Sequence, residues 1–228
     1  MNSSFGDSSL ERAEPTMDKK EVIIIDIEAD KIINQFRDNI EDIKSKFKLV
    51  EKLSESEEIE QSKDILRSQV VFLLSALDFY MHEIVKWGIV KIFQKERPNT
   101  SSYKNFIVSL EVVEKAINNP ENIDWLQEEI IHRNSFKSFL KLEEIKKNIS
   151  MISNNKVVDN AIKKIGKPSD IKGELTHLYV RRNQIAHQSD RDNATTTKND
   201  INLETTRTQV ELVSQFIENI HEELMNED

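Results

Sequence analysis

The chain contains no cysteine, and it has only four glycines and four prolines among its 228 residues. The absence of cysteine excludes disulfides, thiol nucleophiles and cysteine-bound zinc, and it fits a reducing compartment. Glycine and proline form most tight turns, and 32% of the residues are charged. These features disfavour a β-sandwich and favour long helices, so we predict an all-α fold.

Long apolar runs are missing as well. The longest one, 70–74, is far shorter than the ~18 residues of a membrane-spanning helix. The N-terminus lacks the basic region followed by an apolar region that marks a secretory signal. We therefore expect a soluble, cytoplasmic protein that does not associate with a membrane.

Acidic residues outnumber basic ones, and the formal net charge is −9. This balance argues against a surface that nucleic acid coats uniformly. The charge is uneven, however, because residues 163–191 hold seven Lys or Arg and three acids, a net of +4. Such a segment can steer a phosphate-bearing ligand. From charge alone, an ordinary solvated helix face explains it better.

Apolar periodicity predicts the order of the helices. Residues 1–20 are polar and serine-rich and are predicted to be a disordered tail, followed by a single helical domain over 21–228. Residues 22–27 have the propensity of a short strand. Beyond them, Phe36, Ile40, Ile43, Phe47 and Val50 step by 4, 3, 4 and 3, which is a helical seam.

The helix over 65–93 is apolar on most sides, so we expect it to lie at the centre. The last helix, over 202–226, has a regular seam formed by Val210, Val213, Ile217, Ile220 and Leu224. The remaining helices are predicted at 103–117, 122–132, 135–149, 156–165 and 170–187.

The helix over 170–187 has a charge on its apolar side. Arg182 lies in the middle of a stripe formed by Leu175, Leu178, Tyr179, Ile185 and Ala186. A guanidinium there is costly to desolvate unless it is paired. We expect an acid from another helix, a subunit interface or a bound phosphate to compensate it.

His187 ends the same helix, one turn after Asn183. Arg182 and His187 are five positions apart, so on an ideal helix they diverge by about 140°. They converge only if the helix ends near residue 187 or if they act across a subunit boundary.

These groups suit attack by a ribose 2′-hydroxyl on the adjacent phosphate. The histidine can move the proton, the arginine fork fits a phosphate and stabilises charge, and the amide of Asn183 can orient the imidazole. No metal is needed, because the nucleophile is already tethered to the substrate. On spacing alone, a surface histidine and an arginine in a core salt bridge explain the pair better.

Segment 178–187, LYVRRNQIAH, resembles the motif of HEPN-domain ribonucleases, in which an arginine and a polar residue precede a histidine. Arg182, Asn183 and His187 match that motif in its four-residue-gap form. Segments 72–84 and 157–170 resemble the branch called RiboL-PSP-HEPN. The resemblance extends over roughly residues 60–225 and is strongest around 178–188.

The resemblance implies an all-α, HEPN-type bundle with long antiparallel helices and short helical insertions. It implies that Arg182, Asn183 and His187 are catalytic and that two protomers pair with their motifs facing each other. Many members are toxins or anti-phage effectors that cut RNA and leave a 2′,3′-cyclic phosphate, whereas others only bind. RNA is the implied ligand, and an antitoxin or an ATPase is a possible partner.

Three further residues are candidates for supporting roles. Asp78 and His82 share one face of the central helix with Ser75, and the simplest interpretation is that this is its single wet stripe. The functional interpretation is that Asp78 or His82 backs the active site or pairs with Arg182. Arg181 either contacts phosphate or is an ordinary surface charge. No cofactor or metal is expected, because no metal-binding HExxH or glycine-rich phosphate loop is present.

Overall fold

The computed structural model describes residues 28–192 and 196–227, in which every named element is a helix and Arg191 and Lys198 form an isolated antiparallel β-bridge. The predicted tail over 1–20 and the strand-like stretch over 22–27 lie outside it. The elements are α1 (Ala29–Ser45), α2 (Phe47–Glu55), α3 (Ile59–Phe93), the short 3-10 helix η1 (Tyr103–Asn105), α4 (Leu110–Asn118), α5 (Asp124–Asn134), α6 (Leu142–Ile149), α7 (Val157–Ile165), α8 (Pro168–Gln188) and α9 (Leu203–Met225).

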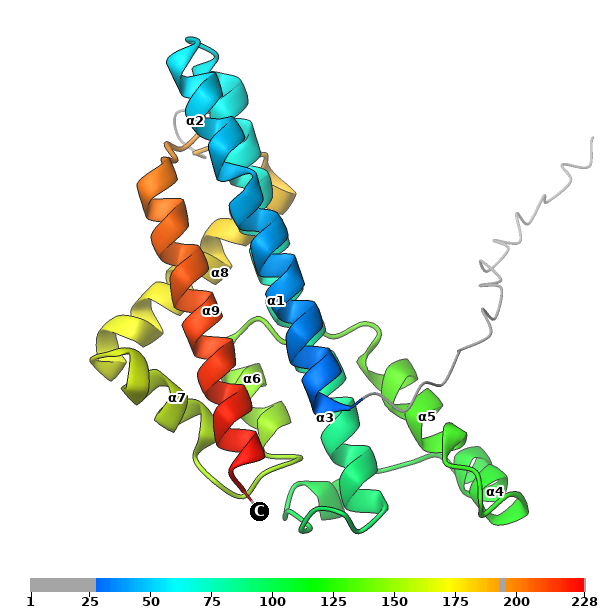
Figure 1. Ribbon diagram of the computed structural model, residues 1–228. Coiled ribbons are helices and arrows are strands. Elements are labelled where there is room, and N and C mark those ends of the chain that lie inside the picture. Colours follow the sequence, from blue (N-terminus) through cyan, green and yellow to red (C-terminus); the bar gives the residue numbers. More distant parts are fainter. Residues whose placement is uncertain (1–27, 193–195, 228) are drawn as a thin grey trace, which may run out of the picture.

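Three long helices form the body of the molecule. Helix α1 runs antiparallel to α3, and α9 lies beside both (Figure 1). Helix α7 packs on α9, and α8 crosses the bundle and packs on α3 and α7. Helices α4 and α5 form an arm at one end of α3, away from α8 (Figure 1). The expected all-α bundle of long antiparallel helices with short insertions is confirmed.

The two predicted seams form the core. Every residue of the α1–α2 seam is buried, and so is every residue of the α9 seam. Both seams face α3, whose Tyr80 is fully buried and meets the ring of Phe36 at 5.8 Å in an edge-on arrangement. The central position expected for the most apolar helix is therefore correct.

Two predicted helices are shorter than periodicity indicated. The helix expected over 103–117 begins only at Leu110, because the Ser109 side chain caps it by accepting from Val112 N. The helix expected over 135–149 begins only at Leu142. Before it, the backbone N–H of Phe139 donates to the Asp78 carboxylate at 2.6 Å, and the Phe139 side chain is fully buried.

No helix in the described part of the chain is both long enough and apolar enough to cross a membrane.

Candidate active site

Helix α8 carries the predicted motif. It begins at Pro168, whose fixed φ and missing N–H suit the first helical position. Its first half is anchored by Leu175 and Leu178, which are buried against the core. Beyond Leu178 the burial of the helix decreases, and the residues from Ala186 to the helix end are exposed. The motif therefore lies where α8 emerges from the bundle.

Arg182 is half-buried and has no carboxylate partner among the described residues. Its Nη1 donates to the Oδ1 of the adjacent Asn183 at 3.1 Å, and its Nε is buried without any hydrogen-bond partner. An acid from another helix, the first of the three compensations expected from the sequence, is thus not found in this part of the protein. A subunit interface and a bound phosphate remain.

His187 is exposed on the last turn of the helix. Because α8 stays helical to Gln188, the side chains of Arg182 and His187 leave the helix in different directions. No hydrogen bond joins them in the described chain. The Asn183 Oδ1 is occupied by Arg182 rather than by the imidazole. Within one protomer the helix brings together Arg182 and Asn183, but not His187.

Arg181 lies in an ion pair rather than as a separate charge on the surface. It forms an ion pair with the fully buried Asp190, with Nη1 2.7 Å from Oδ1 and Nη2 2.9 Å from Oδ2. Burial lowers the pKa of the Arg181 guanidinium, and the negative charge of Asp190 opposes that effect. The structure thus gives Arg181 a largely buried ion pair with Asp190.

Arg67 and Asp190 were missed by the sequence reasoning. Arg67, on α3, donates from Nε to Asp190 Oδ2 at 2.7 Å, and its side chain is only 7% exposed. One signal was available, because Arg67 lies between the buried Leu66 and Val70 and is another charge on an apolar helix side. Asp190 carried no such signal, since it lies among the polar residues of a loop.

The basic segment 163–191 is partly neutralised, by acids of α7 and α9 and by acids within the segment itself. Lys164 pairs with Glu222 and Glu223 of α9, and Lys172 lies 3.4 Å from Asp159 of α7. The interpretation as ordinary helix faces is therefore favoured over a broad phosphate-steering patch. Arg182 differs from these residues in lacking an acidic partner among the described residues.

Asp78 and His82 support the fold near α8. Asp78 accepts from Phe139 N, as described above, and His82 Nε2 lies 3.2 Å from the carbonyl oxygen of Lys137. The His82 ring stacks on Phe139 with centroids 4.1 Å apart. In the described chain neither residue bonds to Arg182. Both instead hold the segment between α5 and α6 against α3.

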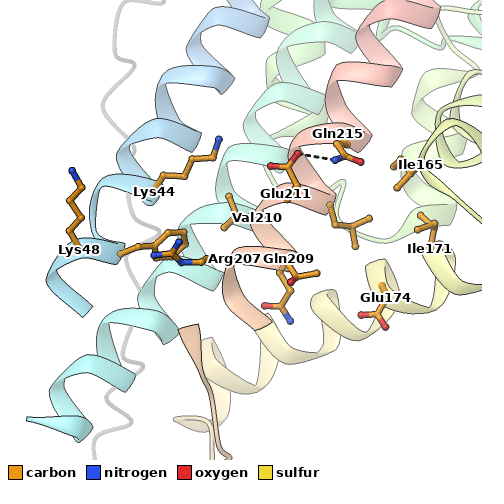
Figure 2. Close-up of a pocket in the computed structure, with 13 residues that line it drawn as sticks. Lys44, Lys48, Ile165, Ile171, Glu174, Arg207, Gln209, Val210, Glu211 and Gln215 are labelled. Carbon is orange, nitrogen blue, oxygen red and sulfur yellow. Dashed lines mark hydrogen bonds between the residues drawn. The ribbon is translucent and has the colours of Figure 1, made fainter. Parts of the chain in front are cut away.

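A groove of about 760 Å³ opens elsewhere, between the α1–α2 junction, α9 and the start of α8. Figure 2 shows Lys44 and Lys48 along one wall and Ile165 and Ile171 along the other, with α9 between them. None of the motif residues lines this groove. Neither the groove nor any other part of the described chain gathers three His, Asp or Glu side chains closely enough to hold a metal ion.

The described chain is an all-α bundle with Arg182, Asn183 and His187 at one helix end, and its fold class is that of a HEPN-type domain. A family model described as RiboL-PSP-HEPN matches residues 20–226. The chain therefore belongs to the RiboL-PSP-HEPN family. No curated protein and no solved structure matches it. HEPN domains are generally related to ribonucleases, bind RNA and often dimerise.

Proposed function

We propose that the chain is a metal-independent endoribonuclease that acts as a homodimer, with Arg182, Asn183 and His187 in its active site. The observation that carries this proposal is the state of Arg182. It lies half-buried on the seam of α8, its Nε has no partner, and the described residues supply no acid for it. A half-buried guanidinium with an unpartnered Nε and no carboxylate beside it can accept an anion.

The chemistry follows from the residue types. His187, as a base, takes the proton of a ribose 2′-hydroxyl, whose oxygen attacks the adjacent phosphorus. The O2′–P bond forms, the P–O5′ bond breaks, and the leaving 5′-oxygen takes up a proton from water, while the proton on His187 returns to solvent. Arg182 stabilises the charge that develops on the phosphoryl oxygens. Asn183 holds the guanidinium through the 3.1 Å bond to Arg182 Nη1.

In this proposal, pairing of two protomers accounts for the separation of Arg182 and His187 within one chain. His187 diverges from Arg182 within one helix, but a second α8 facing the first can place one chain's imidazole beside the other chain's guanidinium. The same contact covers the half-buried seam residues Arg182 and Ile185. The association thus supplies each site with its histidine and covers the seam.

Within this proposal the enzyme is a cytoplasmic toxin or anti-phage effector, controlled by an antitoxin or an ATPase partner. The net charge of −9 fits a protein that binds RNA at one site rather than over its whole surface.

The experiment is cleavage of RNA by wild-type protein and by His187→Ala, with and without EDTA. We expect cleavage by the wild type in EDTA and none by the variant, with unchanged helical content in the variant. Substrate with a 2′-deoxy sugar at the cut site should resist. Cleavage that stops in EDTA, or persists in His187→Ala, overturns the proposal.

The second candidate is a non-catalytic HEPN-like module that binds RNA or a protein. The separation of Arg182 and His187 within one protomer favours it, because a binding module needs no such convergence. In that case RNA binds with a steep dependence on salt and is never cut. Arg182→Ala then changes association or binding alone, which light scattering and filter binding separate.

A further inference from the structure

One buried carboxylate fastens the end of the motif helix. Asp190 accepts from Arg67 of α3 at 2.7 Å, from Arg181 of α8 at 2.7 and 2.9 Å, and from the side-chain amide of Asn199 at 3.2 Å. Its side chain is 1% exposed. A single group therefore joins the central helix, the motif helix and the returning side of the loop after α8.

We propose that Asp190 is a positioning residue for His187. Through Arg67 and Arg181 it fixes the last two turns of α8, and these turns hold the imidazole in place for the reaction. The inference rests on the proposed function, because it assigns Asp190 a part in RNA cleavage.

The backbone shows why the helix end needs an anchor. Helix α8 ends at Gln188, and the next two residues are left-handed, with φ 52° at Ser189 and 57° at Asp190. Neither is glycine, so both adopt a sterically disfavoured conformation that persists only where the surroundings impose it. Asp190 N donates to Gln184 O at 3.0 Å, which closes the helix at that conformation.

The loop is held at its far side too. Arg67 and Arg181 donate to the carbonyl oxygens of Asn199 and Asp200, each at 2.9 Å. Lys63 of α3 forms an ion pair with Asp200 at 2.9 Å. These bonds fix residues 199–200, where the chain returns from the loop, to α3. The Asp190 carboxylate therefore lies between α8 and a second segment that is also fixed to α3.

The negative charge is essential to this connection. Arg67 and Arg181 are both largely buried, with 7% and 19% of their side chains exposed, and both converge on Asp190. With a neutral amide in place of the carboxylate, Arg67 keeps Asp64 at 2.8 Å, but Arg181 loses its carboxylate partner while it still faces Arg67 in the protein interior. The C-terminal part of α8, which carries Arg181, then loses the carboxylate that joins it to Arg67 of α3.

Asp190→Asn tests the inference, and Glu227→Gln is the matched control. Glu227 is also a buried carboxylate paired with an arginine, Arg97, at 2.9 Å, but beyond the opposite end of α3 from Arg67. We expect Asp190→Asn to lower kcat about 100-fold and to leave KM for RNA unchanged. Glu227→Gln should lower the thermal midpoint without changing kcat. Equal losses of kcat in both variants, or no loss in Asp190→Asn, overturn the inference.

Arg67→Lys serves if Asp190→Asn does not fold. It keeps the positive charge and removes the guanidinium fork, so we expect a smaller loss of kcat, again with unchanged KM. Unchanged kcat in Arg67→Lys contradicts the anchoring role.

Hydrogen exchange separates this inference from the proposed function. In Asp190→Asn, or in Arg67→Lys in its place, amides of 182–190 should exchange faster than in the wild type, whereas those of 213–224 should not change. If the wild type cuts no RNA, the proposed function fails and His187 has no reaction to be positioned for. If it cuts RNA but exchange over 182–190 is unchanged, the positioning role alone fails.

Discussion

Two adjacent arginines on α8 have opposite environments. Arg181 forms an ion pair with the buried Asp190, whereas the next residue, Arg182, has a buried Nε without a hydrogen-bond partner. The first arginine stabilises the fold, and the second is held at a cost in stability. An apolar substitution at each position therefore distinguishes the structural role of Arg181 from the functional role proposed for Arg182.

Arg182→Met should abolish RNA cleavage and raise the free energy of unfolding by about 1 kcal/mol, because it removes an unpaired buried polar group. Arg181→Met, its matched control, should lower that free energy by about 3 kcal/mol, because it leaves Asp190 as a buried charge with one cation fewer. Urea denaturation measures both. A stability loss in Arg182→Met comparable to that in Arg181→Met would mean that Arg182 has a structural partner.

At the scale of the helices, periodicity located most elements because most helices pack one apolar side against α3 or another helix. It failed where a single tertiary bond decides the boundary. The Asp78 carboxylate holds the segment before α6 out of a helix, and the two residues it joins, Asp78 and Phe139, are distant in sequence. The start of α4 is set instead by a local bond, the Ser109 cap, which accepts from the backbone N–H three residues on.

The candidate site was predictable in part. A charge on an apolar stripe identified Arg182, and the resemblance added Asn183 and His187. The partner of Arg181 was not predictable, because Asp190 reaches it only after two left-handed residues turn the chain back. No pattern along the sequence records that α3 contributes Arg67 to the same carboxylate.

A histidine between helices predicts how stability depends on pH. His221 of α9 is buried, and its Nδ1 lies 3.1 Å from the Tyr80 hydroxyl of α3. Burial lowers the pKa of His221, so the unfolded chain, with an ordinary value of about 6.5, takes up the proton first. Stability should therefore fall as the pH is lowered from about 6.5 through the depressed pKa of the folded state.

Thermal midpoints between pH 7.5 and pH 5 measure this effect. His221→Gln keeps an acceptor for Tyr80 and should lose part of the acid sensitivity. His177→Gln, at an exposed position of α8, should behave like the wild type. The same acid dependence in wild type and His221→Gln would contradict the assignment.

At the scale of the whole molecule, the proposal requires two chains. If one chain's Arg182 acts with the other chain's His187, then Arg182→Ala and His187→Ala are each inactive, but their heterodimer holds one intact site. Refolding an equal mixture yields heterodimers as about half of all dimers, so about a quarter of the wild-type activity should return. A mixture as inactive as its components would place both residues of each site in one chain.

The end groups of the cut RNA test the central claim most directly. Attack by the 2′-hydroxyl requires a 2′,3′-cyclic phosphate on one fragment and a 5′-hydroxyl on the other. We predict these ends for wild-type protein in EDTA, and no fragments from His187→Ala. Fragments with a 3′-hydroxyl and a 5′-phosphate would contradict the account, because a water-derived nucleophile would then have attacked the phosphorus.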